Sequence, residues 1–148
     1  MATGEHLFKL TIAYEWTGFV GWQRQKKGRT VQAVLEQVCH QIFGKRVDVV
    51  GAGRTDSGVH AKGQIANFKT RSRMPLKNLQ MALNSILPKD IVITHIEEVG
   101  LKFNSQHNAK TKLYRYTIVN NDFVDPFVRI YAVKCFFKLD TAAMTRGA

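Results

Sequence analysis

The sequence predicts an α+β fold with an antiparallel sheet, in the β-α-β-β-α-β order of the ferredoxin-like, or split βαβ, pattern. Two segments with helical spacing of apolar residues alternate with four short segments that suit strands. The 148 residues, 45% hydrophobic and 22% charged, are enough for one domain with a real core. We expect residues 1–100 to form this domain, with helices on one face of the sheet, and residues 101–148 to begin a second half.

The first third of the chain predicts a strand, a loop and a helix. Leu7 to Tyr14 alternates apolar and polar residues, as a half-buried strand does. Residues 15–28 mix glycine, aromatic and basic residues without a period, so we expect a loop. Thr30 suits the N-cap of a helix from Val31 to Phe43, and Gly44 suits its end.

The middle of the chain predicts two strands, a helix and a fourth strand. A strand from Val47 leads into a glycine-rich loop, and another runs from Gln64 to Thr70. Pro75 is expected at the first position of the second helix, and Pro88 ends it. Ile91 to Val99 then reads as a strand.

The remaining residues give weaker signals. Residues 103–108 are polar and predict irregular structure. Alternation predicts strands over residues 112–119 and 128–137. Asp140 suits the cap of a short closing helix.

Charge is the most informative part of the composition. Lys and Arg number 22 against 11 Asp and Glu, a net charge of +11, which favours a polyanionic partner, nucleic acid first. No apolar run approaches the ~20 residues of a membrane span, and no signal-peptide pattern opens the chain, so we expect a cytoplasmic protein and no membrane partner. Cys39 and Cys135 are expected to be buried free thiols.

The stretch from Gly51 to Gly63 is the candidate site. It holds four glycines and one acid, Asp56, with Arg54 two residues before it and His60 four after. Glycines allow close approach of the backbone to a ligand, and Arg54 would favour the ionised form of the carboxylate. Equally, Asp56 could be a turn residue bonded to its own backbone, with Arg54 as a surface partner of little energetic value.

Other kinds of site fit poorly. The histidines are scattered and the cysteines form no close pair, so no metal site is predicted. The loop lacks the Gly-Lys-Ser/Thr ending of a phosphate loop. A triad of Ser57, His60 and Asp56 would crowd three groups into five residues.

Three aromatic residues in the first loop have two interpretations. Trp16, Phe19 and Trp22 could pack the loop onto the core, or they could stack on unpaired bases. The sequence slightly favours packing.

The segment Gly53-Arg-Thr-Asp-Ser-Gly-Val-His60 resembles the signature of tRNA pseudouridine synthases of the TruA type, where an alanine usually replaces Ser57. Further segments match that family in order: residues 21–25, 30–32 and 112–116.

The resemblance implies a reaction in which the N1–C1′ bond of uridine is cut, the base turns and C5 joins C1′, with no cofactor or metal. Asp56 would be the essential carboxylate, acting as a nucleophile on the sugar or base, or as a base on the ribose. Tyr114 would stack on the uracil. Arg54 would help to hold the target nucleotide out of the stack. His60 would shape the loop.

The resemblance also implies partners. The substrate would be the anticodon stem-loop of tRNA, and the whole protein would be a homodimer. The residues expected to contact RNA are Arg24, Lys26, Lys27, Arg29, Lys62, Arg71, Arg73 and Lys112.

Family members are considerably longer, so we expect this chain to be an N-terminal part that carries the carboxylate without a complete pocket and is inactive alone. The alternative is an RNA-binding ferredoxin-like module with no chemistry of its own.

Overall fold

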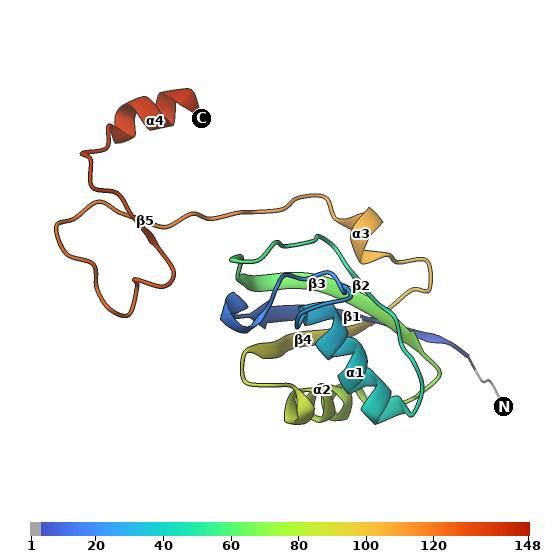
Figure 1. Cartoon of the computed structure of the whole chain (residues 1–148). Helices are drawn as coiled ribbons and strands as arrows, with labels where there is room; N and C mark the ends of the chain where they lie inside the picture. The colour runs from blue at the N-terminus through green and yellow to red at the C-terminus, as the bar shows by residue number, and fades with distance from the viewer. Residues whose placement is uncertain (1–3) are drawn as a thin grey trace. The chain divides into compact units, whose positions relative to one another are not determined.

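The computed structural model describes residues 4–148, which divide into two compact units (Figure 1). The first unit ends at Lys110, and the second runs from Thr111 to Ala148. The sequence predicts this boundary after residue 100. The first unit extends further because a short helix after the last strand packs back onto the sheet.

The first unit is built on a four-stranded antiparallel sheet. Its strands are β1 (His6–Tyr14), β2 (Val49–Gly51), β3 (Ala61–Thr70) and β4 (Ile91–Val99), in the order β2-β3-β1-β4. Each strand lies close to its predicted position, and β4 has its predicted ends. The sheet confirms the predicted α+β fold with antiparallel strands.

Helix α1 (Val31–Phe43) has the ends that the sequence predicts. At its start, the Thr30 side chain accepts a hydrogen bond from the main-chain N–H of Ala33, at 3.3 Å. At its end, Gly44 adopts the left-handed conformation with φ of 66°, which favours glycine.

Helix α2 (Leu76–Ile86) begins one residue later than predicted. Pro75 occupies the N-cap position and makes no side-chain capping hydrogen bond, because proline has no side-chain acceptor. The helix ends before Leu87, whose backbone is extended as expected ahead of a proline.

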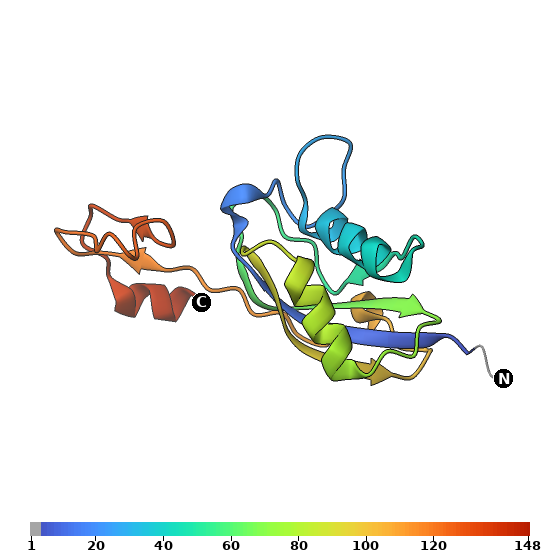
Figure 2. The ribbon, with the colours of Figure 1, turned by 90° about the horizontal axis from the view of Figure 1, so that it is seen from below.

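Both helices cover one face of the sheet, where the core of the first unit lies (Figures 1 and 2). Alternate residues of β1 point into this core, and the apolar stripes of the helices meet them. Burying these side chains is the main favourable contribution to folding. Fully buried members of the core are Leu10, Ile12, Val31, Leu35, Phe68, Leu79, Leu83 and Ile93.

A short helix, α3 (Ser105–Asn108), replaces the irregular segment predicted there. The side chain of Asn104 caps it by accepting hydrogen bonds from the next N–H groups, including that of Gln106 at 2.9 Å. The helix docks through the N–H of Ser105, which donates to Asn67 Oδ1 at 2.7 Å. Successive side chains of a strand point to opposite faces of a sheet, and the β3 neighbours of Asn67 belong to the helix-covered core. Asn67 therefore points to the opposite face, which is the face that α3 covers.

The second unit contains β5 (Ile118–Val119), β6 (Val133–Lys134) and α4 (Thr141–Gly147). The closing helix is confirmed, with Asp140 accepting a hydrogen bond from the N–H of Ala143 at 2.9 Å. The two long strands predicted here are wrong, because only two residues of each form a ladder, and the pairing is parallel.

The apolar side chains of the second unit explain that difference. Most of them remain exposed, so the alternation that predicts strands does not correspond to a buried face within this unit. Cys135 is partly exposed rather than buried in a strand, whereas Cys39 is buried as predicted. Exposed members include Leu113, Tyr116, Phe123, Phe127, Phe136 and Phe137.

Among residues 4–148, the helices are all too short or too polar to span a bilayer.

Candidate active site

Asp56 lies in the loop between β2 and β3, residues 52–60, which confirms the predicted strand-loop-strand arrangement. The two strands pair antiparallel and so hold both ends of the loop. Within the loop, the carbonyl oxygen of Gly53 accepts a hydrogen bond from Gln64 Nε2 at 2.7 Å. The strand pairing and this hydrogen bond therefore fix the position of the start of the loop.

A second loop, residues 15–29, supports the Asp56 loop from the side. Gly21 and Asp56 form an isolated antiparallel bridge. Next to it, the main-chain N–H of Trp22 donates to the carbonyl oxygen of Thr55 at 2.9 Å. Two stretches far apart in sequence thus meet backbone to backbone at the candidate site.

The approach at this bridge requires glycine. Gly21 has φ of 121°, and a Cβ atom built there would lie 2.9 Å from the carbonyl oxygen of Thr55. The hydroxyls of Tyr14 and Thr55 share a hydrogen bond of 2.6 Å on the same side of the loop. The residue before Asp56 is therefore fixed through both its backbone and its side chain.

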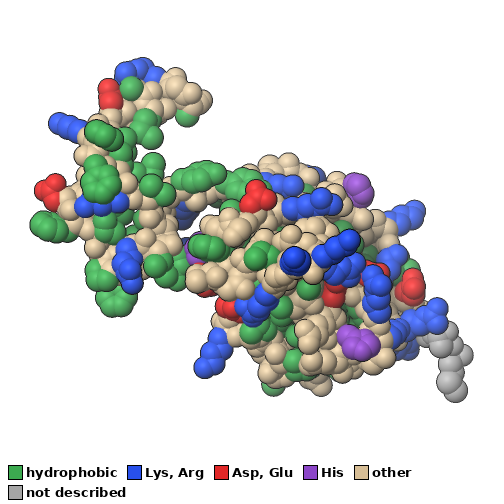
Figure 3. All heavy atoms as spheres, in the orientation of Figure 1, with side chains coloured by type: hydrophobic (Ala, Val, Ile, Leu, Met, Phe, Trp, Pro, Cys, Tyr) green, Lys and Arg blue, Asp and Glu red, His purple; other side chains and the backbone are tan. Residues whose placement is uncertain are grey.

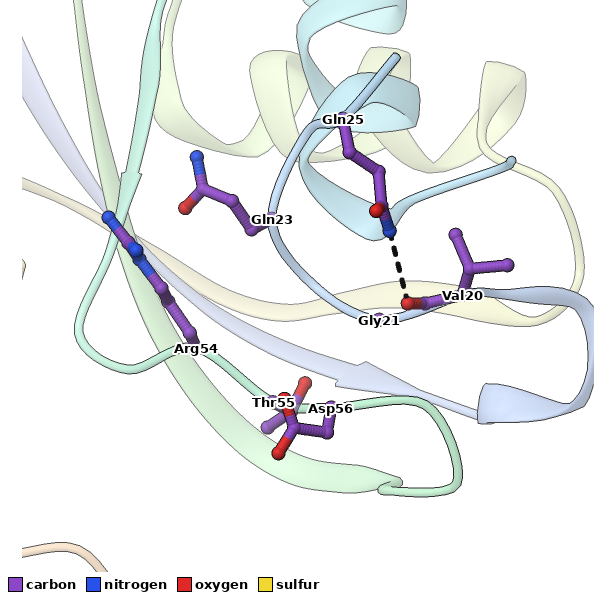
Figure 4. A pocket seen from close by; sticks show the side chains of 7 residues that line it. All are labelled: Val20, Gly21, Gln23, Gln25, Arg54, Thr55 and Asp56. Atoms are coloured by element: carbon purple, nitrogen blue, oxygen red, sulfur yellow. Dashed lines mark hydrogen bonds between the residues drawn. The ribbon is translucent and has the colours of Figure 1, made fainter. Parts of the chain in front are cut away.

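The two loops enclose a hollow of about 290 Å³ (Figure 4). Asp56 is exposed there, and within residues 4–148 its carboxylate accepts no hydrogen bond and forms no ion pair. The carboxylate is thus available to a ligand. The hollow is lined by Val20, Gly21, Gln23, Gln25, Arg54, Thr55 and Asp56.

Arg54 does not pair with Asp56, contrary to our expectation. Figure 4 shows the two side chains pointing in different directions from the same loop. Arg54 is exposed and faces the rim of the hollow.

Asp56 forms a turn, but through its backbone and not through its side chain. Its carbonyl oxygen accepts a hydrogen bond from the N–H of Val59 at 3.3 Å, which closes a turn. Its side chain bonds none of the described backbone, so the carboxylate is not used to build that turn.

His60 supports the loop, as expected. Its Nδ1 accepts a hydrogen bond from the main-chain N–H of Trp16 at 3.2 Å, and the Trp16 ring meets it edge-on. Glu15 Oε1 lies 3.5 Å from the same nitrogen, beyond a normal hydrogen bond. Nδ1 accepts here, which assigns the ring proton of neutral His60 to Nε2.

The aromatic residues of the second loop mainly pack. Phe19 and Trp22 are 3% and 1% exposed and belong to the core, which confirms the packing interpretation for both. Trp16 is partly exposed beside His60.

Two arginines expected to contact RNA are held by carboxylates within the chain. Arg24 Nη1 lies 2.6 Å from Glu36 Oε2. Arg29 donates to both oxygens of Asp90, at 2.6 and 2.9 Å. These hydrogen bonds hold the pKa of Asp90 below its ordinary value.

The other basic residues expected to contact RNA are exposed, as Arg24 and Arg29 also are. Figure 3 shows Lys and Arg side chains spread over the visible face of the molecule. Lys26 and Lys27 extend from the second loop, and Lys112 lies with Tyr114 in the second unit. The remaining exposed ones are Lys62, Arg71 and Arg73.

Gln23 and Gln25 line the hollow, although neither was predicted to be a site residue. Gln25 is oriented by a hydrogen bond from its Nε2 to the carbonyl oxygen of Val20 at 3.3 Å. The ordered resemblance over residues 21–25 was the signal that could have identified both. The pairings of Glu36 and Asp90 had no local signal, because their partners are distant in sequence.

No group of three or more histidine, cysteine or acidic side chains within residues 4–148 is placed to hold a metal ion.

The part of the chain that forms the sheet, its helices and the Asp56 loop matches one protein family. A family model described as tRNA pseudouridine synthase matches residues 11–108. This span contains α1, α2, α3 and the Asp56 loop, with β2, β3, β4 and the last part of β1. The chain belongs to the tRNA pseudouridine synthase family.

Three curated relatives are named tRNA pseudouridine synthase A. That of Caldicellulosiruptor saccharolyticus is 44% identical over 93% of this chain and 57% of its own length. That of Acetivibrio thermocellus is 44% identical over 95% and 57%. That of Thermodesulfovibrio yellowstonii is 44% identical over 92% and 54%. The chain thus spans little more than half the length of these relatives.

Proposed function

We propose that this chain carries the site of an enzyme that isomerises uridine to pseudouridine in tRNA, with Asp56 as its essential carboxylate. The observation that carries this proposal is the exposed carboxylate of Asp56, which has no partner among residues 4–148 and lies in a hollow built by two loops. Family membership and the names of the relatives support the reaction. The basic surface suits a polyanionic substrate.

The reaction rearranges the nucleotide without changing its composition. The N1–C1′ bond breaks, a C5–C1′ bond forms, C5 loses its proton and N1 gains one. Asp56 has three candidate roles: attack on the sugar, attack on the base, or removal of a ribose proton. Each requires the carboxylate to reach a nucleotide that has left the base stack, which its exposed position permits.

Arg54 and Tyr114 would handle the target nucleotide. Arg54 points away from Asp56, so it suits holding the displaced nucleotide by its phosphate better than it suits neutralising the carboxylate. Tyr114 is 56% exposed and would stack on the uracil.

We also propose the finer description of the fold. The strand order β2-β3-β1-β4, with a helix between β1 and β2 and another between β3 and β4, supports a ferredoxin-like, split βαβ domain. Residues 101–148 would then begin the second half, although the first compact unit ends at Lys110.

The proposed partner is the anticodon stem-loop of tRNA in the cytoplasm, bound by a homodimer of the whole protein. Exposed Lys26, Lys27, Lys62, Arg71 and Arg73 would meet its phosphates, with Lys112 from the second unit. Arg24 and Arg29 fit that role less well because carboxylates already bind them.

Tritium release from tRNA labelled at uridine C5 tests this proposal. The assay compares the 148-residue chain with a chimera in which the chain replaces the matched part of the Caldicellulosiruptor saccharolyticus relative. We expect the chimera to release tritium from an isolated anticodon stem-loop and the 148-residue chain to bind it without release. Binding by both proteins without release by either would support an RNA-binding module instead.

A further inference from the structure

The loop that supports the Asp56 site is fixed at both ends to one residue. Asp90 lies in the turn between α2 and β4. At one end of the loop, its carbonyl oxygen accepts a hydrogen bond from the N–H of Glu15 at 2.9 Å. At the other, its carboxylate accepts two hydrogen bonds from Arg29, at 2.6 and 2.9 Å. Such two-bond pairing fixes orientation as well as distance.

Two further residues of the loop contact the Arg29 guanidinium, whose side chain stays 38% exposed. It lies 4.1 Å from the centre of the Phe19 ring, which is 3% exposed. A Cβ atom at Gly18 would lie 2.8 Å from Arg29 Nη1 and 3.2 Å from Asp90 Oδ2. Gly18 and Phe19 of the loop therefore pack directly against this ion pair.

Backbone hydrogen bonds connect the pair to the site. The carbonyl oxygen of Arg29 accepts from the N–H of Val20 at 2.9 Å. The next residue, Gly21, forms the bridge with Asp56. Displacement of Arg29 would therefore pass through two residues to the Asp56 loop.

We propose that Arg29 and Asp90 are positioning residues of the Asp56 site, and that Arg29 is not an RNA contact. The lowered pKa of Asp90 agrees with a pair that is ionised and intact at neutral pH. The importance of the pair for catalysis rests on the proposed function. Its effect on the position of the Asp56 loop does not.

Amide NMR spectra of the 148-residue chain test the positioning directly. Arg29→Gln and Asp90→Asn should each move the amide signals of Thr55 and Asp56 and speed hydrogen exchange at Trp22 about tenfold, the effect of losing a hydrogen bond to a charged group. A pair that only adds global stability would leave the native signals of Thr55 and Asp56 in place.

The direction in which each substitution changes the affinity for tRNA distinguishes a positioning role of Arg29 from a phosphate contact. If Arg29 bound phosphate, Arg29→Gln would weaken binding, and Asp90→Asn, which releases Arg29, would strengthen it. Positioning predicts changes of less than about twofold for both, within the usual scatter of surface substitutions. Arg29→Lys adds a further comparison, because lysine binds phosphate but cannot pair with both carboxylate oxygens. We expect Arg29→Lys to move the Asp56 amide as Arg29→Gln does.

Matched controls remove the same charges elsewhere. Arg46→Gln breaks an exposed pair with Asp48, and Glu97→Gln breaks the pair with Lys9. Neither should move the amides of the Asp56 loop. Opposite affinity changes in the two test variants, or unmoved Thr55 and Asp56 amides, would overturn the proposal. If Asp56 proved not to be catalytic, these NMR results would be unchanged. Failure of the proposed function and failure of the positioning proposal can therefore be distinguished.

Discussion

Gly51 ends the strand that leads into the Asp56 loop, and its missing side chain lets the Trp22 indole lie against the backbone. A Cβ atom at this position would be 2.5 Å from Trp22 Cε2. Trp22 is fully buried, and its main-chain N–H donates a hydrogen bond to the carbonyl oxygen of Thr55. A shift of Trp22 away from position 51 would therefore disturb the site. A single methyl group at position 51 would thus affect both stability and the loop.

Gly51→Ala should therefore destabilise the protein by about 2 kcal/mol, the usual cost of overpacking a core. Urea unfolding followed by Trp fluorescence measures this change. Gly63→Ala is the matched strand control, because its Cβ would meet only Thr11, at 3.9 Å. Equal effects of the two substitutions would show that strand glycine in general, rather than contact with Trp22, determines the cost.

The ion pair of Arg29 with Asp90 should make stability depend on pH. The pKa of Asp90 is lower in the folded protein, so the pair stabilises above the ordinary carboxyl pKa of about 4 and this contribution is lost as pH falls through the folded value. Asp90→Asn should lower the free energy of unfolding by about 1 kcal/mol at pH 7 and by much less at pH 3. A difference that grows toward acid pH would contradict the assigned ionisation.

At the scale of elements, local signals predicted α1 best. The Thr30 cap and the Gly44 stop are adjacent to the helix, so the sequence contains all that defines its ends. The same holds for the glycine-rich loop between β2 and β3. The strands predicted over residues 112–119 and 128–137 failed because a strand depends on a partner and a buried face, which no local pattern supplies.

The site shows the same division between local and distant information. The place of Asp56 in a loop between two strands was predictable from the loop itself, because four glycines lie within thirteen residues. The pairing of Arg29 with Asp90 was not predictable, because 61 residues separate them. Charge alone made Arg29 resemble an RNA contact, and only the tertiary contact revealed its partner.

Thr30→Ala tests the cap at the start of α1. Thr30 is buried and its hydroxyl accepts from the N–H of Ala33, so we expect a loss of about 1 kcal/mol in the free energy of unfolding. Chemical denaturation measures it, and Thr30→Ser, which keeps the acceptor, should recover most of the loss. Equal losses for alanine and serine would assign the effect to the methyl group instead.

At the scale of the whole molecule, a net charge of +11 predicts binding of tRNA that weakens with salt, because phosphate contacts release counterions. The exposed lysines of the second loop should contribute to it. Replacing Lys26 and Lys27 with glutamine should lower affinity and reduce the slope of log K against log salt by about 2. Lys77→Gln on α2 is the control, and site choice on tRNA should stay the same. An unchanged slope would remove the two lysines from the RNA-binding surface.

The carboxylate of Asp56, which has no partner within the described part of the chain, is proposed to perform the chemistry. The most direct measurement is tritium release from tRNA labelled at uridine C5, comparing the chimera with its Asp56→Asn variant and with Ser57→Ala, an exposed neighbour in the same loop. We expect release by the chimera and by Ser57→Ala, and loss of at least about a thousandfold in Asp56→Asn with tRNA affinity retained. Continued release by Asp56→Asn at a comparable rate would contradict the account.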